Sequence, residues 1–349
     1  MGFTRRNDET ELLRREDIDS NFHDPYILNG YRPPNKGVWE TLQYSLNSHC
    51  NESFNTWSHA IALVYFIGRF YHAFIGHWQD PLFYPLMSLS IGILAVFSMS
   101  TMAHALNSLS GKTRNRCFFF DYAGISIYGL GSGQVIYFYC RKLGVFEESS
   151  TSLYLFLAAS LATSVITNIL MCSTRHRWCQ SKVLYRTVSC LMPFLVNSLP
   201  YFYRLSYCGD LADNCDVTHL RIYLKHVMFL LLTALSNVFK LPERRYPGRF
   251  DALGQSHHFV HVFIALACED MFEFSFKEMG RRASVIPMNS ITPDFYNSIL
   301  FTTVGVLGNL LIASFFNNDT EIAVKKIKKQ RYSRTSSTFF IYYSCRKLC

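Results

Sequence analysis

Apolar residues gather along this chain into eight runs, and short polar links separate the runs. The runs cover Asn55–Phe74, Leu82–Asn107, Phe118–Cys140, Ser152–Cys172, Val183–Tyr203, His219–Phe239, Gly254–Phe276 and Tyr296–Phe316. Each is about 20 residues long, the length of helix that crosses the hydrocarbon core of a bilayer. Inside lipid, such a segment satisfies its own backbone hydrogen bonds only as a helix. The pattern therefore predicts an all-α integral membrane protein.

The polar residues divide the chain into three regions. Residues 1–55 form a polar amino-terminal region, residues 56–316 a transmembrane helical domain, and residues 317–349 a basic tail. The amino-terminal region and the tail, with every second link, carry 24 of the 34 Lys and Arg residues, while the alternate links carry six. The positive-inside rule then places both ends of the chain in the cytosol.

The composition and charge of the chain indicate which kind of partner it has. The chain is 49% hydrophobic and carries a net charge of +9. Because the positive charge lies in the links and the tail, it suits loops beside an anionic lipid leaflet rather than a nucleic-acid-binding surface. We expect the lipid bilayer to be a partner and nucleic acid not to be one.

The cysteines do not indicate a disulfide framework. They number eleven, and no two are spaced as Cys-x-x-Cys. Cys208 and Cys215 share one link, and they form a bridge if that link faces an oxidising compartment. The alternative is two free thiols, and the sequence favours neither.

Four ionisable residues fall inside the predicted helices, where such side chains are costly and usually functional. His104 is near the end of the second run, Asp121 near the start of the third, and His257 and His261 near the start of the seventh. The second helix ends in the cytosolic leaflet, and the third and seventh begin there. The predicted topology therefore brings all four residues to one depth.

Their spacing suits a metal. His257 and His261 are four residues apart and project from one helix face. With His104 they offer three nitrogen ligands, and three protein ligands plus water is the arrangement of a catalytic zinc site. Asp121 is predicted to hold that water or to orient a ligand, and Ser100, one turn before His104, to donate a nearby hydrogen bond.

Other polar residues have simpler interpretations. His258 and His261, three apart, also share a helix face, so the spacing alone leaves His258 as an alternative ligand to His257. We interpret three further histidines as packing residues bonded to backbone carbonyls: His59, His72 and His226. Three acidic residues of the seventh helix either form its solvated outer end, which we favour, or line an outer vestibule: Glu269, Asp270 and Glu273.

Several short motifs occur together in one known family. They are Ser100-x-x-x-His104, the following Asp121, His257-x-x-x-His261, Glu52-x-x-Asn55-x-Trp57-Ser58-His59, Pro242-Glu243-Arg244, Pro247-Gly248-Arg249-Phe250-Asp251 and Gly254-x-Ser256-His257. Through them, residues 25–316 resemble the progestin and adipoQ receptor family, from which Ser58 departs slightly because Thr is frequent there. The motifs Asp24-Pro25-Tyr26-Ile27 and Gly30-Tyr31-Arg32-Pro33, with the eighth helix, are most similar to its membrane progestin receptor branch.

The resemblance implies a seven-helix transmembrane core around zinc, an added eighth carboxy-terminal helix and a cytosolic amino terminus. It implies that His104, His257 and His261 hold the zinc and that Asp121 reaches it through water. His257 is preferred to His258 because the family often has Gln at the latter position. The implied location is the plasma membrane, with a cytosolic signalling protein as a further partner.

Two functions are compatible with this reading. The first is a receptor for a steroid, progestin-like in view of the resemblance. The second is a zinc-dependent lipid amide hydrolase, similar to the alkaline ceramidases, with Asp121 and Ser100 in catalytic roles. A G-protein-coupled receptor is disfavoured because the charge distribution predicts the opposite orientation.

Overall fold

Helices make up nearly all the regular structure of the computed structural model, which describes residues 12–47, 49–142, 149–176, 182–208, 215–285 and 290–317. Within these residues there is no strand, and an isolated bridge joins Leu13 and Tyr31. The all-α prediction is therefore confirmed. The predicted basic tail, apart from Asn317, lies outside the described residues.

A helix covers each of the eight predicted apolar runs. The helices are α1 (Val38–Asn47), α2 (Ser53–His77), α3 (Tyr84–Leu106), α4 (Gly111–Cys140), α5 (Ser150–His176), α6 (Lys182–Leu205), α7 (Val217–Phe239), α8 (Ser256–Val285) and a last helix, Phe295–Asn317, whose start η4 (Phe295–Leu300) is a π-helix. The short α1 precedes the first run. Four of the described helices are long and apolar enough to cross a membrane: Pro81–Leu106, Ser150–Arg175, Val217–Phe239 and Phe295–Asn317.

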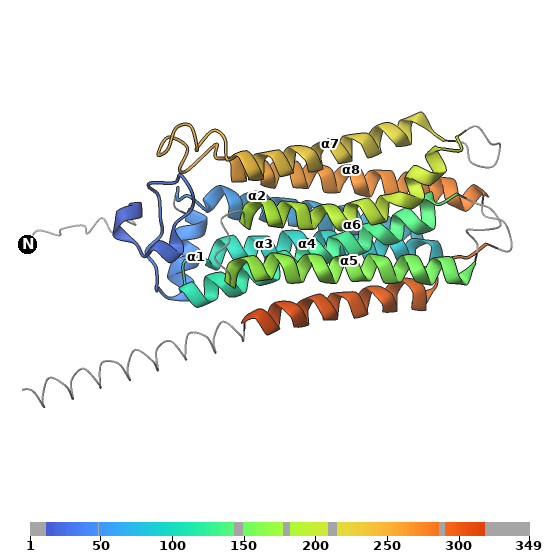
Figure 1. Ribbon diagram of the computed structural model, residues 1–349, viewed down its shortest axis with the longest axis horizontal. Coiled ribbons are helices and arrows are strands. Elements are labelled where there is room, and N and C mark those ends of the chain that lie inside the picture. The colour runs from blue at the N-terminus through green and yellow to red at the C-terminus, as the bar shows by residue number, and fades with distance from the viewer. Residues whose placement is uncertain are drawn as a thin grey trace, which may run out of the picture.

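The long helices lie side by side along one axis, with the N-terminal segment at one end (Figure 1). Most residues of α4 are buried, which places this helix at the centre of the bundle. It packs closely against α3 because glycines face the neighbouring backbone. A Cβ on Gly92 would lie 2.7 Å from the Tyr128 Cα, and one on Gly131 would lie 2.5 Å from the Ser88 carbonyl oxygen. Small residues of this kind allow close helix packing in membranes.

Polar side chains fasten the last helix to the bundle. Asn168 of α5 donates to the Asn309 side chain at 3.0 Å, and Gln134 of α4 donates to Thr302 at 2.6 Å. Thr302 in turn donates to Ser88 of α3 at 2.8 Å. These bonds are buried, and they satisfy polar groups for which a membrane interior offers no water. The last helix is thus an integral part of the bundle.

The alternative left open for Cys208 and Cys215 is resolved. The two cysteines form a disulfide with a Cα–Cα distance of 5.5 Å. It lies in the connection between α6 and α7, at the end of the bundle opposite the N-terminal segment (Figure 1).

The acidic residues of α8 do not form a solvated helix end, and that prediction is wrong. Arg69 of α2 forms ion pairs with Glu269 and Glu273, each at 3.0 Å. Asp270 pairs with Lys225 of α7 at 3.2 Å. The helix continues well beyond them. They carry interhelical ion pairs, which a sequence pattern cannot distinguish from exposed charges.

A buried ionic network joins three helices near the disulfide. Glu278 of α8 is fully buried and accepts two hydrogen bonds from Arg204 of α6, at 2.8 and 3.1 Å. Arg281 donates to the same carboxylate at 3.0 Å, and His219 of α7 lies 2.7 Å from it. A single carboxylate therefore holds the ends of α6, α7 and α8 together.

Candidate metal centre

Three histidines from two helices meet at the end of the bundle that carries the N-terminal segment. His104 lies in the last turn of α3, and His257 and His261 lie in the first turns of α8. The start of α8 is fixed by Glu243, whose carboxylate accepts hydrogen bonds from the Ser256 amide, at 2.8 Å, and from its hydroxyl. Because α3 ends where α8 begins, the three imidazoles reach the same depth.

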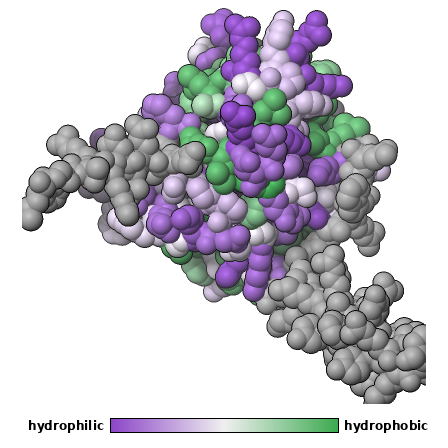
Figure 2. Space-filling model, turned by 90° about the vertical axis from the view of Figure 1, so that its left-hand side faces the viewer, coloured by the Kyte–Doolittle hydropathy of each residue, from purple (hydrophilic) through white to green (hydrophobic). Residues whose placement is uncertain are grey.

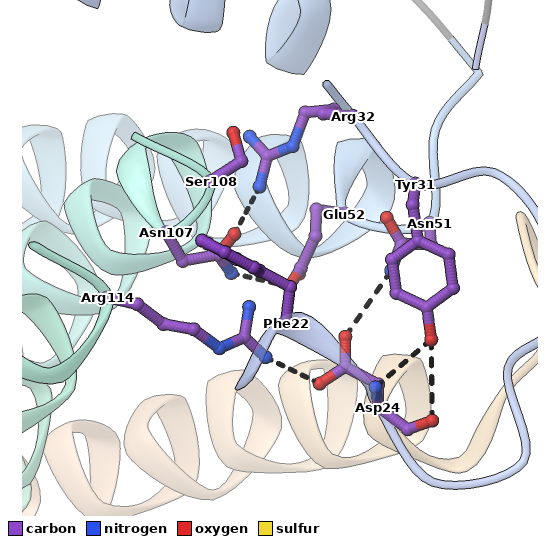
Figure 3. Close-up of a pocket in the computed structure, with 9 residues that line it drawn as sticks. All are labelled: Phe22, Asp24, Tyr31, Arg32, Asn51, Glu52, Asn107, Ser108 and Arg114. Carbon is purple, nitrogen blue, oxygen red and sulfur yellow. Dashed lines mark hydrogen bonds and ion pairs between the residues drawn. The ribbon is translucent and has the colours of Figure 1, made fainter. Parts of the chain in front are cut away.

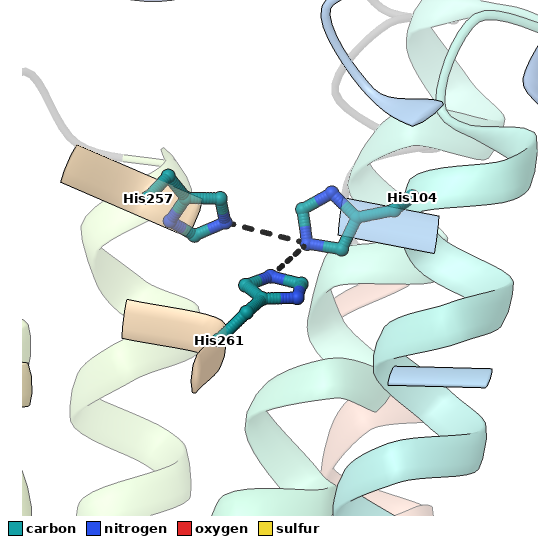
Figure 4. A group of neighbouring side chains, drawn as sticks. All are labelled: His104, His257 and His261. Atoms are coloured by element: carbon teal, nitrogen blue, oxygen red, sulfur yellow. Dashed lines mark hydrogen bonds between the residues drawn. The ribbon is translucent and has the colours of Figure 1, made fainter. Parts of the chain in front are cut away.

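The three rings point their Nε2 atoms toward one another (Figure 4). The His104 Nε2 lies 3.3 Å from that of His257 and 3.2 Å from that of His261. Each residue offers a ligand atom within 4.8 Å of the other two. Ligands about 2.0–2.1 Å from a tetrahedral zinc lie about 3.3–3.4 Å apart, so the spacing fits such an ion.

Hydrogen bonds at the Nδ1 atoms of His104 and His261 leave their Nε2 atoms free to bind a metal. His104 donates from Nδ1 to the Glu52 carboxylate at 2.7 Å, and His261 Nδ1 lies 3.0 Å from the Ser58 hydroxyl. A metal-ligating histidine commonly bonds a carboxylate or hydroxyl in this way, which fixes its tautomer and ring orientation. The donor set and its supporting bonds therefore both fit a metal ion.

Glu52 is buried at the start of α2, and its second carboxylate oxygen accepts a hydrogen bond from Asn107 at 2.5 Å. Burial by itself raises the pKa of the Glu52 carboxyl, but the charge and hydrogen bond of His104, together with the charge of Arg32, hold that pKa well below its usual range. Glu52 therefore stays ionised. In the sequence Glu52 stands out only as part of a motif, although an acidic residue just before a predicted membrane helix is a usable signal.

Replacing Glu52 with Gln should weaken metal binding about 10- to 100-fold, the usual effect of losing a carboxylate partner of a histidine ligand. Gln keeps the size of the side chain but removes its charge, so His104 loses its strongest orienting contact. Chelator competition on the purified protein measures the affinity. Glu40→Gln is the control, because the Glu40 side chain is 53% exposed and its polar contacts in the described chain are with Lys36 and the Gly37 amide. Equal affinities for Glu52→Gln and the native chain would contradict this role.

His258 does not join the group. It is buried, its Nδ1 accepts a hydrogen bond from the Gly254 amide at 3.0 Å, and its ring packs on Phe54 with 4.4 Å between centroids. The structure thus brings His257, and not His258, to the other two histidines. The remaining polar nitrogen of His258, Nε2, finds no hydrogen-bond partner in the described part of the chain.

The other histidines differ from one another. His226 donates to the Ala267 carbonyl at 2.8 Å, so its interpretation as a packing residue is confirmed. His59 stacks on His261 at 3.7 Å between centroids and also packs against Phe97, and its two ring nitrogens bond no backbone carbonyl in the described chain. His72 is exposed, so its interpretation as a packing residue is wrong.

Asp121 and Ser100 lie beside the three histidines but outside the group. Asp121 is on α4, and the Ser100 hydroxyl of α3 donates a hydrogen bond to its carboxylate. The predicted link between Asp121 and a metal through water, and the catalytic roles of both residues, stay predictions.

The chain is similar to known proteins over most of its length. Residues 47–269 match the Haemolysin-III related family, and this range contains all three histidines. Membrane progestin receptor delta of Mus musculus is 30% identical over 312 residues, which cover 88% of this chain and 90% of that protein. Membrane progestin receptor gamma-B of Danio rerio is 28% identical over 300 residues, 80% and 85% of the two chains. Membrane progestin receptor gamma of Homo sapiens is 29% identical over 268 residues, 75% and 79% of the two chains.

Proposed function

The chain belongs to the haemolysin-III-related family, also called the progestin and adipoQ receptor family, and from this membership we propose that it is a membrane receptor for a steroid. The relatives that it matches over most of their length are named membrane progestin receptors, which supports a progestin-like ligand. These relatives and the apolar helices support a multi-pass membrane protein, and a location in the plasma membrane is consistent with both. A cytosolic signalling protein would recognise the steroid-bound receptor.

The receptor would have α2–α8 as a seven-helix transmembrane core, Phe295–Asn317 as an added eighth span, and its N-terminal end in the cytosol. Figure 2 views that end, where most of the visible surface is hydrophilic. The disulfide between Cys208 and Cys215 is at the opposite end, and such bonds persist in oxidising compartments outside the cytosol. The distribution of Lys and Arg supports the same orientation.

We place a zinc ion between His104, His257 and His261, close to the cytosolic surface. The observation that carries this assignment is that the Nε2 atoms of His257 and His261 lie 3.3 and 3.2 Å from that of His104, with Glu52 bonded to the Nδ1 of His104 and Ser58 to that of His261. Three imidazole nitrogens suit zinc, because hard cations such as Ca²⁺ and Mg²⁺ prefer oxygen ligands.

A zinc-dependent lipid amide hydrolase is the second candidate, and the position of Asp121 favours it. Bound zinc lowers the pKa of a coordinated water to about 7 and polarises a carbonyl. The Asp121 carboxylate, which Ser100 holds beside the histidines, would take up the proton of the attacking water. Hydrolysis would then be part of signalling or separate from it.

One variant separates the two functions. His104→Ala removes a zinc ligand while α8 keeps the other two. If purified His104→Ala protein loses ceramide hydrolysis but still binds progestin, the site is catalytic. If it loses progestin binding, and native protein hydrolyses no ceramide, the site serves the receptor alone. Radioligand binding and a lipid-product assay on the same preparation measure both, and Ser98→Ala on the exposed side of α3 is the control.

A further inference from the structure

A segment before the first long helix contacts the end of α3 and the residues that lead into α8. We call residues 28–32 the strap. It lies at the N-terminal end of the bundle, far from α3 and α8 in sequence but in contact with the end of one and the approach to the other. Its contacts are hydrogen bonds to backbone and side-chain groups, so they depend on position as well as on charge.

Arg32 holds the end of α3. Its guanidinium donates to the His104 carbonyl at 2.9 Å and to the Ala105 carbonyl at 2.8 Å. It also donates to the Asn107 side chain at 2.5 Å and to the Ser45 hydroxyl of α1. Arg32 is buried, and the last carbonyls of a helix lack partners of their own. The planar guanidinium group of Arg32 therefore fixes the helical turn from which the His104 imidazole projects.

The other end of the strap holds the approach to α8. Asp251, five residues before α8 begins, accepts hydrogen bonds from the Leu28 amide at 3.2 Å and the Asn29 amide at 2.8 Å. The Asn29 side chain adds a third bond at 3.0 Å. Asp251 is buried, so these bonds replace the hydrogen bonds that its carboxylate would otherwise make with water.

The middle of the strap is hydrogen-bonded to the residue that precedes Glu52. The Asn51 amide donates to the Gly30 carbonyl at 2.9 Å, and the Asn51 carbonyl accepts from Gln255, directly before α8, at 3.0 Å. Glu52 follows Asn51 in the chain. Gly30 has a φ of +82° and faces Asn51 closely, which suits a residue without a side chain.

A small cavity of about 10 Å³ lies under the strap, and Figure 3 shows Arg32, Glu52 and Asn107 among its lining residues. It has room for about one water molecule. The Ser108 hydroxyl on its wall is buried and bonds no other group in the described structure. The strap therefore covers a small polar cavity beside Glu52.

We propose that the strap sets the separation of α3 and α8 at the metal centre, with Arg32 and Asp251 as positioning residues for the histidine ligands. This inference rests on the proposed zinc site. The strap can hold the two helices at a fixed separation only while it is bonded at both ends. Loss of the Arg32 bonds or of the Asp251 bonds should therefore free the two helices to the same extent. Two independent helix caps would behave differently, because their effects would multiply.

The test compares zinc affinity in Arg32→Lys, Asp251→Asn and the double variant. Chelator competition measures the affinity, and the visible spectrum of the cobalt-substituted protein reports ligand geometry. Each single change should weaken zinc binding about tenfold, and the double variant should be no weaker than the worse single variant. Arg15→Lys is the matched control, because Arg15 donates to the Asp24 and Ile27 carbonyls just before the strap without touching α3 or α8.

The outcomes are distinct. Absence of zinc from the native chain would refute the zinc site itself. With zinc present, unchanged affinity in both single variants, or losses that multiply in the double variant, would overturn the strap. If Arg32→Lys does not fold, Ser45→Ala replaces it, since this change removes one acceptor of Arg32 at the α3 end of the strap. A smaller loss of affinity, absent when Asp251 is already Asn, would support the bridge, and unchanged affinity would overturn it.

Discussion

Changing His257 and His261 together to alanine is expected to remove the metal completely from a chain that otherwise holds one zinc. Both imidazoles come from one face of α8, and their Nε2 atoms converge on that of His104. The variant leaves one of three protein ligands, and one imidazole alone does not retain zinc against a chelator. Metal analysis of the purified protein after dialysis measures the content, and loss should leave the helical signal in circular dichroism largely unchanged.

His258→Ala is the matched control for this result. His258 neighbours a proposed ligand in the chain, but its ring packs on Phe54 and its Nδ1 bonds the Gly254 amide. The variant should therefore keep one zinc per chain, although lost packing will lower its thermal stability. Zinc loss on changing His258 alone would mean that the register of α8 differs from the one described.

The helices were predictable because the membrane imposes a simple rule on sequence. A segment that crosses lipid must be apolar over about 20 residues, and every predicted run is a helix in the structure. Their polar ends were less predictable. Glu269 and Glu273 looked like exposed charges at a helix end, yet both contact Arg69 of a distant helix. A hydropathy pattern shows that a residue is charged, but it does not show which residue that charge pairs with.

The three histidines were predictable for a related reason. Residue type, spacing and depth together limit which side chains can meet, and a histidine inside a membrane helix is rare enough to be informative. Glu52 and Arg32 were not predicted to support the site. Arg32 lies in an irregular segment and Glu52 directly before α2, and their contacts with His104 join residues 72 and 52 positions apart. The Cys208–Cys215 bond was undecidable for a similar reason, since it depends on the geometry of the link and on its compartment.

Glu278→Gln is expected to cost about 3–5 kcal/mol of folding free energy, the effect of removing one partner of a buried ion pair. Glu278 is fully buried and Arg204 is 1% exposed, so the change leaves a guanidinium without a counter-charge in a water-poor interior. Glu273→Gln is the control on the same helix. Its side chain is 36% exposed, and its partner Arg69 also contacts Glu269, so its loss should cost less than about 1 kcal/mol.

Thermal unfolding of the purified variants in one detergent compares the two changes, and adding Arg204→Met to Glu278→Gln identifies the cause. If the penalty comes from the orphaned cation, removing that cation should restore part of the lost stability, although Arg281 and His219 still face the position. If the double variant is less stable than Glu278→Gln alone, Arg204 stabilises the bundle through contacts other than this carboxylate. Equal costs for Glu278→Gln and Glu273→Gln would show that water reaches Glu278, and that the end of the bundle near the disulfide is open.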